Sequence, residues 1–478
     1  MSAIICTFAG KLDTFMQTNT WNFKHGFLMG GGLVVVGLAL QMSLGPVNWA
    51  IVSWPVNIIL MAAMLAIVAA IYMLRKRVYA FQFMGTYQCA VPALAYAVVQ
   101  TVIMGLTRQH TGASWFSDML SFWPFVLTYI YMCVILGVII LRRLMHLSSW
   151  RRDVPFLLNH LGLFVALTTA TLGNADMQRV KMIVATGQSE WRALDERSMV
   201  KQMPMAIELK RFIMESYPDG KPKRFASQIH ITTKSGKNID TTIDVNKPYE
   251  VDGWKIYQFG YDTQMGAKSQ VAILELVSDP WLPLVYTGIF MMLGGALLMV
   301  LYTRWRMKRL LPIGLLLVLA LAIVSYLMPV VRSKSLVPAL QSPWFYPHIF
   351  VYIVCYSFMG VAFAMSIWKL VRGQKSTLKL QQIDNMVYVG LIFMTFGMMF
   401  GAFWAKEAWG HYWEWDPKET WAAITWLSYL LYIHYRLFPR HKERLALGMI
   451  VVSFVLLQMC WWGIRFLPAA QGASVHTY

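Results

Sequence analysis

Long apolar runs decide what this chain can fold into. Eleven of them have spanning length, because about 20 residues are enough to cross the hydrocarbon core of a bilayer. The runs lie near residues 26–44, 51–73, 80–105, 121–141, 154–173, 279–302, 310–329, 346–369, 386–405, 420–436 and 445–464. Hydrophobic residues make up 57% of the chain and charged residues only 14%, a balance typical of polytopic membrane proteins. We therefore predict an all-α polytopic membrane protein with about 11 transmembrane helices.

The distribution of Lys and Arg predicts the orientation of these helices. One set of connecting loops holds 19 of these residues, whereas the opposite short loops and the tail hold six. Cytoplasmic loops carry the excess of positive charge, so the first set is predicted to be cytoplasmic. The N-terminus is then predicted to lie inside and the C-terminus outside. The net charge of +19 comes from these clusters and not from a basic face with stacking aromatics, so no nucleic-acid partner is expected.

One long polar stretch, residues 174–278, interrupts the apolar runs. It holds short segments rich in β-branched and aromatic residues, at Ile229–Thr233, Asp240–Val245, Trp254–Tyr261 and Val271–Val277. Glycines lie between them, as expected for turns. Because the stretch follows a span that runs from inside to outside, we predict one inserted β-rich extracytoplasmic domain.

The five cysteines exclude two classes of protein. None is arranged as CxxC, and no CxxCH haem-attachment motif occurs. The chain is therefore not itself a c-type cytochrome, and it has no thioredoxin-like redox pair. The first 24 residues contain no arginine, so we expect no cleavable signal.

An aromatic segment, residues 404–421, reads WAKEAWGHYWEWDPKETW between two apolar runs. Its large rings are Trp404, Trp409, Tyr412, Trp413, Trp415 and Trp421. Tryptophans collect at membrane interfaces, so an aromatic belt is one interpretation. The other is a platform for a large flat apolar ligand, since so many rigid rings stand close together. Asp416 followed by Pro417 also predicts the start of a helix, with Asp as the N-cap.

Four histidines are candidate ligands for a metal or for haem iron. His160 and His434 lie at similar depth near the cytoplasmic ends of two spans, where ionisable residues indicate function. The alternative is that each histidine only forms a hydrogen bond with a neighbouring helix. His25 opens the first span on the same side and is a rival to His160. On the outer side, His348 opens a span and His476 lies near the C-terminus, which suits two axial ligands beside an aromatic wall.

Several segments resemble one family. Trp409–Ala422 resembles the tryptophan-rich WWD signature of the CcsA/CcmC/CcmF group of cytochrome c biogenesis proteins. Ser342–Phe350 and Gly472–Tyr478 are similar to its two flanking histidine segments, and Leu157–Gly173 with the polar stretch is similar to ResB/CcsB proteins. The whole resembles a fused CcsB–CcsA protein, the system II cytochrome c synthase.

The resemblance covers roughly residues 154–478 and, with the apolar runs before it, divides the chain into three parts. Residues 1–150 would be four N-terminal transmembrane helices of unknown role. Residues 151–305 would form a ResB/CcsB-like unit that contains the β-rich domain. Residues 306–478 would form a CcsA-like haem-handling domain with the WWD loop at 404–421.

The resemblance also implies the chemistry. Haem b would be the substrate, with His160, His434, His348 and His476 as axial ligands of its iron. The rings of the WWD loop, together with Asp416, would surround it. The protein would carry haem across the membrane and attach it to the CxxCH thiols of apocytochrome c, as a holocytochrome c synthase or haem lyase. A thioredoxin-like protein would keep those thiols reduced, and membrane lipid would surround the spans.

Two other functions stay open. A haem exporter or chaperone would deliver haem without joining it to protein, and the absence of an internal thiol catalyst leaves this alternative open. A b-type cytochrome subunit of a quinol oxidoreductase would use histidines for electron transfer. That class places histidine pairs on the same helices, whereas each candidate here lies on a separate segment.

Overall fold

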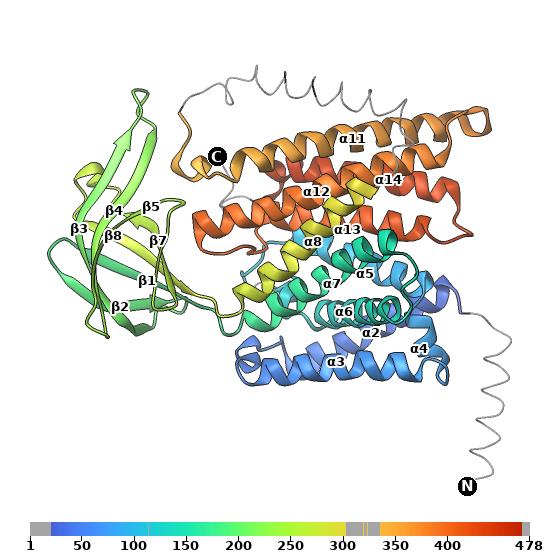
Figure 1. The fold of residues 1–478 in the computed structure, drawn as a ribbon, viewed down its shortest axis with the longest axis horizontal. Helices are drawn as coiled ribbons and strands as arrows, with labels where there is room; N and C mark the ends of the chain where they lie inside the picture. Colours follow the sequence, from blue (N-terminus) through green and yellow to red (C-terminus); the bar gives the residue numbers. More distant parts are fainter. Residues whose placement is uncertain (1–20, 113, 303–318, 320–322, 324–334, 471–478) are drawn as a thin grey trace, which may run out of the picture.

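A computed structural model describes residues 21–112, 114–302 and 335–470 of the chain, together with Leu319 and Ile323. It has two parts, a bundle of long helices and a β domain at one end of the bundle (Figure 1). We call the end of the bundle beside the β domain the near end and the opposite end the far end.

Most of the described residues are helical. The long helices and one short one are α2 (Phe23–Leu44), α3 (Val56–Leu74), α4 (Tyr79–Met84), α5 (Tyr87–Leu106), α6 (Trp123–Leu144), α7 (Trp150–Gly173), α8 (Leu282–Tyr302), α11 (Phe345–Arg372), α12 (Leu380–Trp409), α13 (Pro417–Arg436) and α14 (Glu443–Trp461). Short 3-10 helices are η1 (Trp49–Val52), η2 (Trp115–Ser117), η3 (Met119–Ser121), η4 (Gly266–Lys268), η5 (Pro338–Gln341), η6 (Gly373–Lys375), η7 (Gly463–Phe466) and η8 (Pro468–Ala470).

Within the described ranges, nine helices are long and apolar enough to cross a membrane. The predicted span at 420–436 forms α13, which is 20 residues long but carries several charged and polar side chains. The predicted span at 310–329 falls almost wholly outside the described residues. The prediction of a polytopic helical membrane protein with an inserted β-rich domain is confirmed.

Close contact between α7 and α8 depends on glycine. A Cβ atom placed on Gly288 would lie 2.6 Å from the carbonyl oxygen of Gly162, and one on Gly162 would lie 2.7 Å from the oxygen of Gly288. Small residues let helix backbones approach in this way, which is the usual source of helix association in membranes. The contact fixes α7, the helix that carries His160.

The N-terminal helices belong to the same bundle as the rest. Helix α5 packs along α13, where Trp421 Nε1 donates to the carbonyl oxygen of Gly105 at 3.2 Å. Trp421 is 2% exposed. Figure 1 shows α5, α6, α7 and α13 within one helical body.

The β domain is one antiparallel sheet with the strand order β5-β4-β3-β2-β1-β8-β7-β6. The strands are β1 (Gln178–Ala185), β2 (Ser189–Asp195), β3 (Val200–Ser216), β4 (Pro222–Thr233), β5 (Asn238–Asp244), β6 (Tyr249–Val251), β7 (Trp254–Tyr261) and β8 (Val271–Ser278). Alternate side chains of β1 are buried, as a half-buried strand requires. Ser227 on β4 donates to Gln258 on β7 at 2.6 Å, although these strands are not neighbours in the sheet. The sheet therefore curls around a common apolar core.

The first and last strands of the domain pair with each other, so both chain connections to the bundle lie together. The junction is held by Asp176, whose carboxylate accepts from Trp281 Nε1 at 2.8 Å and Asn57 Nδ2 at 2.7 Å. Asn57 belongs to α3, so the N-terminal helices help to hold the base of the domain.

Candidate functional site

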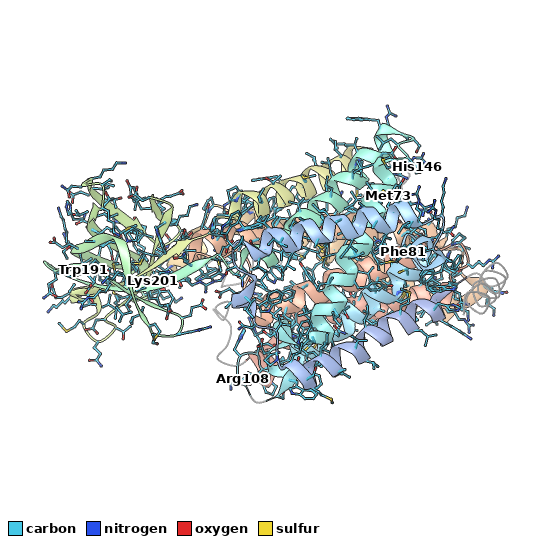
Figure 2. The ribbon with its side chains drawn as sticks, turned by 90° about the horizontal axis from the view of Figure 1, so that it is seen from below. Met73, Phe81, Arg108, His146, Trp191 and Lys201 are labelled. Carbon is cyan, nitrogen blue, oxygen red and sulfur yellow. The ribbon has the colours of Figure 1, made fainter. Side chains whose placement is uncertain are left out.

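A large cavity of about 1870 Å³ lies in the bundle. Drug-sized ligand pockets measure about 300–1,000 Å³, so this one exceeds the needs of a small substrate. Its lining includes Lys201 of the β domain and His146 after α6. Figure 2 shows these two residues at opposite ends of the molecule, so the cavity extends from the near end to the far end.

His160 and His434 face each other in this cavity. His160 lies on α7 and His434 two residues before the end of α13, and both line the cavity. Their ring centroids are 6.4 Å apart and their planes meet at 69°. Phe156 stacks on His160 with a centroid distance of 3.9 Å. The structure thus brings together the two histidines that were paired only because they lie at similar depth in their predicted spans.

The hydrogen bonds of both rings fix which nitrogen can bind a ligand. His160 Nδ1 lies 2.9 Å from the carbonyl oxygen of Phe156, and His434 Nδ1 lies 2.8 Å from that of Leu430. A carbonyl oxygen only accepts, so each Nδ1 carries the proton and each Nε2 keeps its lone pair. This is the arrangement of a metal-binding histidine, whose other nitrogen usually donates to a carbonyl or carboxylate.

The separation of the rings fits one iron atom between them. Imidazole nitrogens bind a metal at about 2 Å, and the ring centre lies roughly 1 Å behind, so two axial imidazoles have centroids roughly 6 Å apart. The observed 6.4 Å agrees with this value. Among the described residues no group of three or more His, Cys, Asp and Glu side chains could hold a metal ion. Haem iron needs only two axial ligands from protein, because the porphyrin supplies the others.

An ion pair fixes α13 close to His434. Arg436 Nε donates to Asp384 Oδ1 of α12 at 2.9 Å, and the Tyr432 hydroxyl donates to the same carboxylate. Asp384 is 5% exposed. Because a buried charge needs its partners, this contact holds the end of α13 in one position.

His25 lies elsewhere. It forms part of the N-cap of α2, where its Nδ1 lies 3.1 Å from the backbone nitrogen of Asn22. Its ring stacks on Trp21 at a centroid distance of 5.5 Å. It is not among the residues that line the cavity, so the structure places His160 beside His434 and does not place His25 there.

The aromatic segment is a turn between two helices. Helix α12 ends at Trp409, and Gly410 follows in the left-handed conformation with φ 81°. Asp416 Oδ1 accepts from the backbone nitrogen of Glu419 at 2.8 Å and so forms the N-cap of α13. Trp415 adopts a φ of 58°, which is uncommon for a residue other than glycine, and such residues cluster at functional sites.

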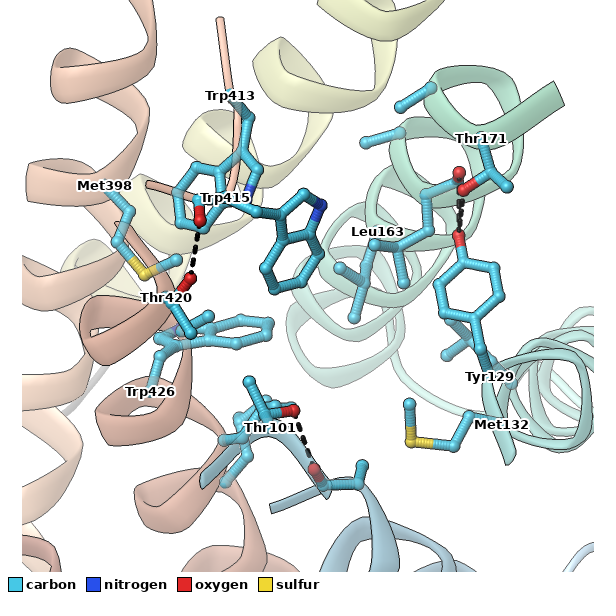
Figure 3. Close-up of a pocket in the computed structure, with 18 of the residues that line it drawn as sticks. Thr101, Tyr129, Met132, Leu163, Thr171, Met398, Trp413, Trp415, Thr420 and Trp426 are labelled. Atoms are coloured by element: carbon cyan, nitrogen blue, oxygen red, sulfur yellow. Dashed lines mark hydrogen bonds between the residues drawn. The ribbon is translucent and has the colours of Figure 1, made fainter. Parts of the chain in front are cut away.

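This turn divides the aromatic residues into two groups. Tyr412, Trp413, Trp415 and Asp416 line the cavity, and Figure 3 shows Trp413 and Trp415 on one side of it with Tyr129 and Thr171 of α6 and α7 on the other. The buried Nε1 of Trp413 has no hydrogen-bond partner among the described residues, which leaves a donor for a ligand.

The second group lies against α11. Trp404 contacts His348 at a ring-centroid distance of 5.7 Å and Trp409 at the same distance, and none of the three lines the cavity. His348 Nδ1 lies 2.9 Å from the carbonyl oxygen of Gly397, so it donates its proton there. Trp421 belongs to neither group, because it packs on α5. His476 lies outside the described residues, so its position is an expectation only.

The β domain contacts this turn, which sequence analysis did not foresee. Arg179 of β1 pairs with Glu414, and its Nε lies 3.8 Å from Glu275 of β8. Beside Gly410, an added Cβ atom would lie 3.1 Å from Val277 and 3.3 Å from Tyr257. Opposite charges separated by some 235 residues give no pattern that a reader of the sequence could detect.

A buried ion pair makes the second connection. Lys406, in the last turn of α12, has its Nζ 3.3 Å from Asp279 Oδ2, which follows β8. Their side chains are 4% and 7% exposed. Both halves of the molecule therefore meet at the near mouth of the cavity.

Burial shifts the acidity of groups at this junction. It raises the pKa of Glu275 to about 6, against an opposing effect of Arg179. It also raises the pKa of the Tyr412 hydroxyl, so this ring is neutral at physiological pH. Burial at the junction therefore disfavours the charged forms of Glu275 and Tyr412, although ion pairs lie beside them.

Known proteins match two regions of the chain. Residues 281–470 match the family model described as Cytochrome C assembly protein, and residues 148–272 match the ResB-like family. Three curated relatives carry the name Cytochrome c biogenesis protein CcsA. The relative from Chlamydomonas reinhardtii is 35% identical over 31% of this chain and 44% of its own length. The relative from Prochlorococcus marinus is 30% identical over 34% of this chain and 62% of its own length. The relative from Guillardia theta is 28% identical over 47% of this chain and 86% of its own length.

This chain therefore spans about half to two thirds of the length of the first relatives. The two matched regions follow one another in one polypeptide, with the described aromatic turn and His434 in the second and His160 in the first.

Proposed function

Because this chain joins a ResB-like domain to a cytochrome c assembly domain, the fused CcsB–CcsA architecture, we propose that it carries haem across a membrane for cytochrome c maturation. The observation that carries the proposal is the His160–His434 pair. Both rings line a cavity that continues to the aromatic turn, each has its Nδ1 bonded to a carbonyl oxygen, and their centroid distance suits one iron atom between them.

The cavity gives a physical reason for transport. Charged haem propionates make the hydrocarbon core a costly medium, and a route enclosed by protein lowers that cost. The distribution of Lys and Arg predicts that the far end is cytoplasmic and that the near end, with the β domain and the aromatic turn, lies outside. Haem would bind first at His160 and His434 and then move along the cavity.

The outer station would form beside the aromatic turn. His348, with its proton held by Gly397, is one proposed axial ligand, and His476 is the other. Trp404 and Trp409 would support the porphyrin face, while the thiols of a CxxCH segment of apocytochrome c add to the vinyl groups. A thioredoxin-like protein would keep these thiols reduced. The chain itself would then act as a holocytochrome c synthase in the inner membrane of a bacterium.

Export without attachment is the second candidate. It is favoured by the lack of a described acid or base aimed at the proposed outer station. Electron transfer between stacked haems is less well supported, because His160 and His434 come from separate helices and the described part of the chain offers no second such pair.

The test uses the full chain purified in detergent with haem supplied. Sharp low-spin bands in the reduced-minus-oxidised spectrum are expected for the wild type. A His160→Ala/His434→Ala variant should lose the far station, and a His348→Ala/His476→Ala variant should lose the outer one. A wild type that takes up no haem would reject the proposal. Covalent haem on a CxxCH reporter would support a synthase, whereas bound haem without attachment would support an exporter.

A further inference from the structure

The far mouth of the cavity is basic. Arg142 and Arg143, at the end of α6, line it, as does His146 after them. Figure 2 shows His146 at the end of the molecule opposite the β domain. The rest of the lining is mostly apolar or uncharged until the β domain is reached, so the charge is concentrated at the two mouths.

Arg143 is held in place next to the histidine pair. Its Nη2 lies 2.6 Å from Asp153 Oδ1, and its guanidinium carbon lies 5.2 Å from the ring centre of Phe156. The ring of Phe156 stacks in turn on His160. Phe156 precedes His160 by four residues on α7, which is roughly one helical turn, or about 6 Å along the axis. Arg143 contacts Phe156, so it lies on the side of His160 that faces the far end.

Arg142 carries a charge that no described acid neutralises. Its Nη1 donates to the carbonyl oxygen of Gly85 at 2.9 Å, and none of the described Asp and Glu side chains pairs with it. Gly85 also lines the cavity, so this bond holds the guanidinium at the mouth. A guanidinium presents several N–H donors in a plane, which is the geometry that binds carboxylates best.

We propose that Arg142 and Arg143 form a carboxylate-binding subsite that holds the propionates of haem while its iron lies between His160 and His434. This inference rests on the function proposed above. The propionates share one edge of the porphyrin, several ångström from the iron, and the subsite lies to one side of the histidine pair. Haem held in this way points its vinyl edge along the cavity towards the aromatic turn.

Basic residues at this end also have a simpler explanation, because cytoplasmic loops collect Lys and Arg for orientation alone. Arg151 provides the matched control. It lies in the first turn of α7 at the same end and is exposed, but it does not line the cavity. If only orientation matters, replacing Arg142 or Arg151 should have the same effect.

The experiment compares two probes on the full chain in detergent. One is haem, and the other is haem dimethyl ester, in which the carboxylates are masked. For Arg142→Gln we expect haem affinity to fall roughly tenfold, as the loss of a charge-assisted hydrogen bond predicts, with ester affinity unchanged. Arg151→Gln should change neither affinity. Arg143→Lys keeps the charge beside Asp153 but removes the planar fork, and should weaken haem binding less than Arg142→Gln.

The two proposals fail in different ways. Equal effects of Arg142→Gln on haem and on its ester, or no effect on either, would overturn the carboxylate subsite while leaving haem binding intact. A wild type that binds neither probe would overturn both. Loss of the far station's share of the low-spin bands with both probes in His160→Ala/His434→Ala supports the proposed function. A fall in the affinity of Arg142→Gln for haem but not for its ester supports the carboxylate subsite.

Discussion

The two facing histidines show how a single hydrogen bond prepares a ligand. His160 and His434 each give the Nδ1 proton to a carbonyl oxygen four residues earlier in their own helix. That carbonyl already belongs to the helix, so no other element is needed to fix the tautomer. Each ring therefore has Nε2 as its acceptor nitrogen before any iron is bound.

A histidine that acts as an axial ligand can be replaced by free imidazole. In a His348→Ala/His476→Ala background, which lacks the proposed outer station, we expect His434→Gly to lose the low-spin haem spectrum. The spectrum should return when imidazole is added, because the cavity is large enough to admit the ring. The measurement is the visible spectrum with and without imidazole. His230→Gly, in the β domain beside Asp240, is the control and should leave the spectrum unchanged. An unchanged spectrum in His434→Gly would remove this residue from the ligand set.

Glu275 makes the β domain sensitive to pH. Burial raises the pKa of its carboxyl from 4.5 to about 6, so the folded state holds a proton that the unfolded chain releases. Its contribution to stability is therefore complete below pH 4.5 and falls as the pH rises to about 6. The rise in pKa is equivalent to about 2 kcal/mol of unfolding free energy.

We expect Glu275→Gln to remove this dependence. The variant should gain stability over the wild type as the pH rises through this window, and the gain should be constant above it. Tryptophan fluorescence during denaturation of the β domain measures it, since Trp254 is buried in its core. A difference between variant and wild type that does not vary with pH would contradict the assignment.

Helix packing decides whether the two histidines meet. Gly288→Val should push α8 away from α7, because the added Cβ atom would lie 2.5 Å from the backbone nitrogen of Ala166. Overpacking of this kind costs about 1–3 kcal/mol. We expect a lower melting temperature and weaker haem uptake. Gly448→Val on α14, where an added Cβ atom meets nothing within 4 Å, is the control and should behave like the wild type.

The pairing of Arg179 with Glu414 connects the β domain to the aromatic turn. Arg179→Glu should place a carboxylate among Glu414, Glu275 and Glu196, and Glu414→Arg should oppose two guanidinium groups. Each single variant should speed hydrogen exchange of the turn amides roughly fivefold to tenfold, equivalent to about 1 kcal/mol.

The double variant Arg179→Glu/Glu414→Arg restores opposite charges, so exchange should return most of the way to the wild-type rate. This recovery separates a specific contact from general damage to either element. Additive effects in the double variant would show that the two side chains do not interact.

The whole molecule encloses a path to which the N-terminal helices contribute. Ala97 lies in the middle of α5, is 4% exposed and lines the cavity. Val99, two residues further on, is 57% exposed and does not line it. Residues 1–150 had no recognised role in the sequence, yet their helices form one wall of the space that the matched domains share.

A bulky residue at Ala97 should therefore block the path. For Ala97→Trp we expect haem to bind at His160 and His434 with a normal spectrum, while haem attached to a CxxCH reporter falls at least tenfold. Val99→Trp adds the same bulk on the outward face and should leave attachment intact. Full attachment by Ala97→Trp would show that haem does not pass along this cavity.

Much of the fold follows from local sequence. Runs of apolar residues long enough to span a bilayer form helices because every backbone polar group must be satisfied within the segment. The predicted segment Trp254–Tyr261 becomes β7 for an equally local reason, since its aromatic residues favour a strand. The similar depth of His160 and His434 in their predicted spans also paired these two residues. It could not decide between His160 and His25, because both lie near the same end of a span and only packing determines which helix faces α13.

The sequence by itself determined the number and kind of most elements, the family resemblance and a short list of candidate residues, because hydrophobic length, periodicity and motif spacing are properties of neighbouring residues. Tertiary structure decided which of them share a space. The turn at Gly410 separated Trp413 and Trp415 from Trp404 and Trp409, and folding brought Arg179 to Glu414 and Arg142 to the mouth of the cavity. Such contacts join residues far apart in the chain, and their energies depend on burial and distance that no local pattern records.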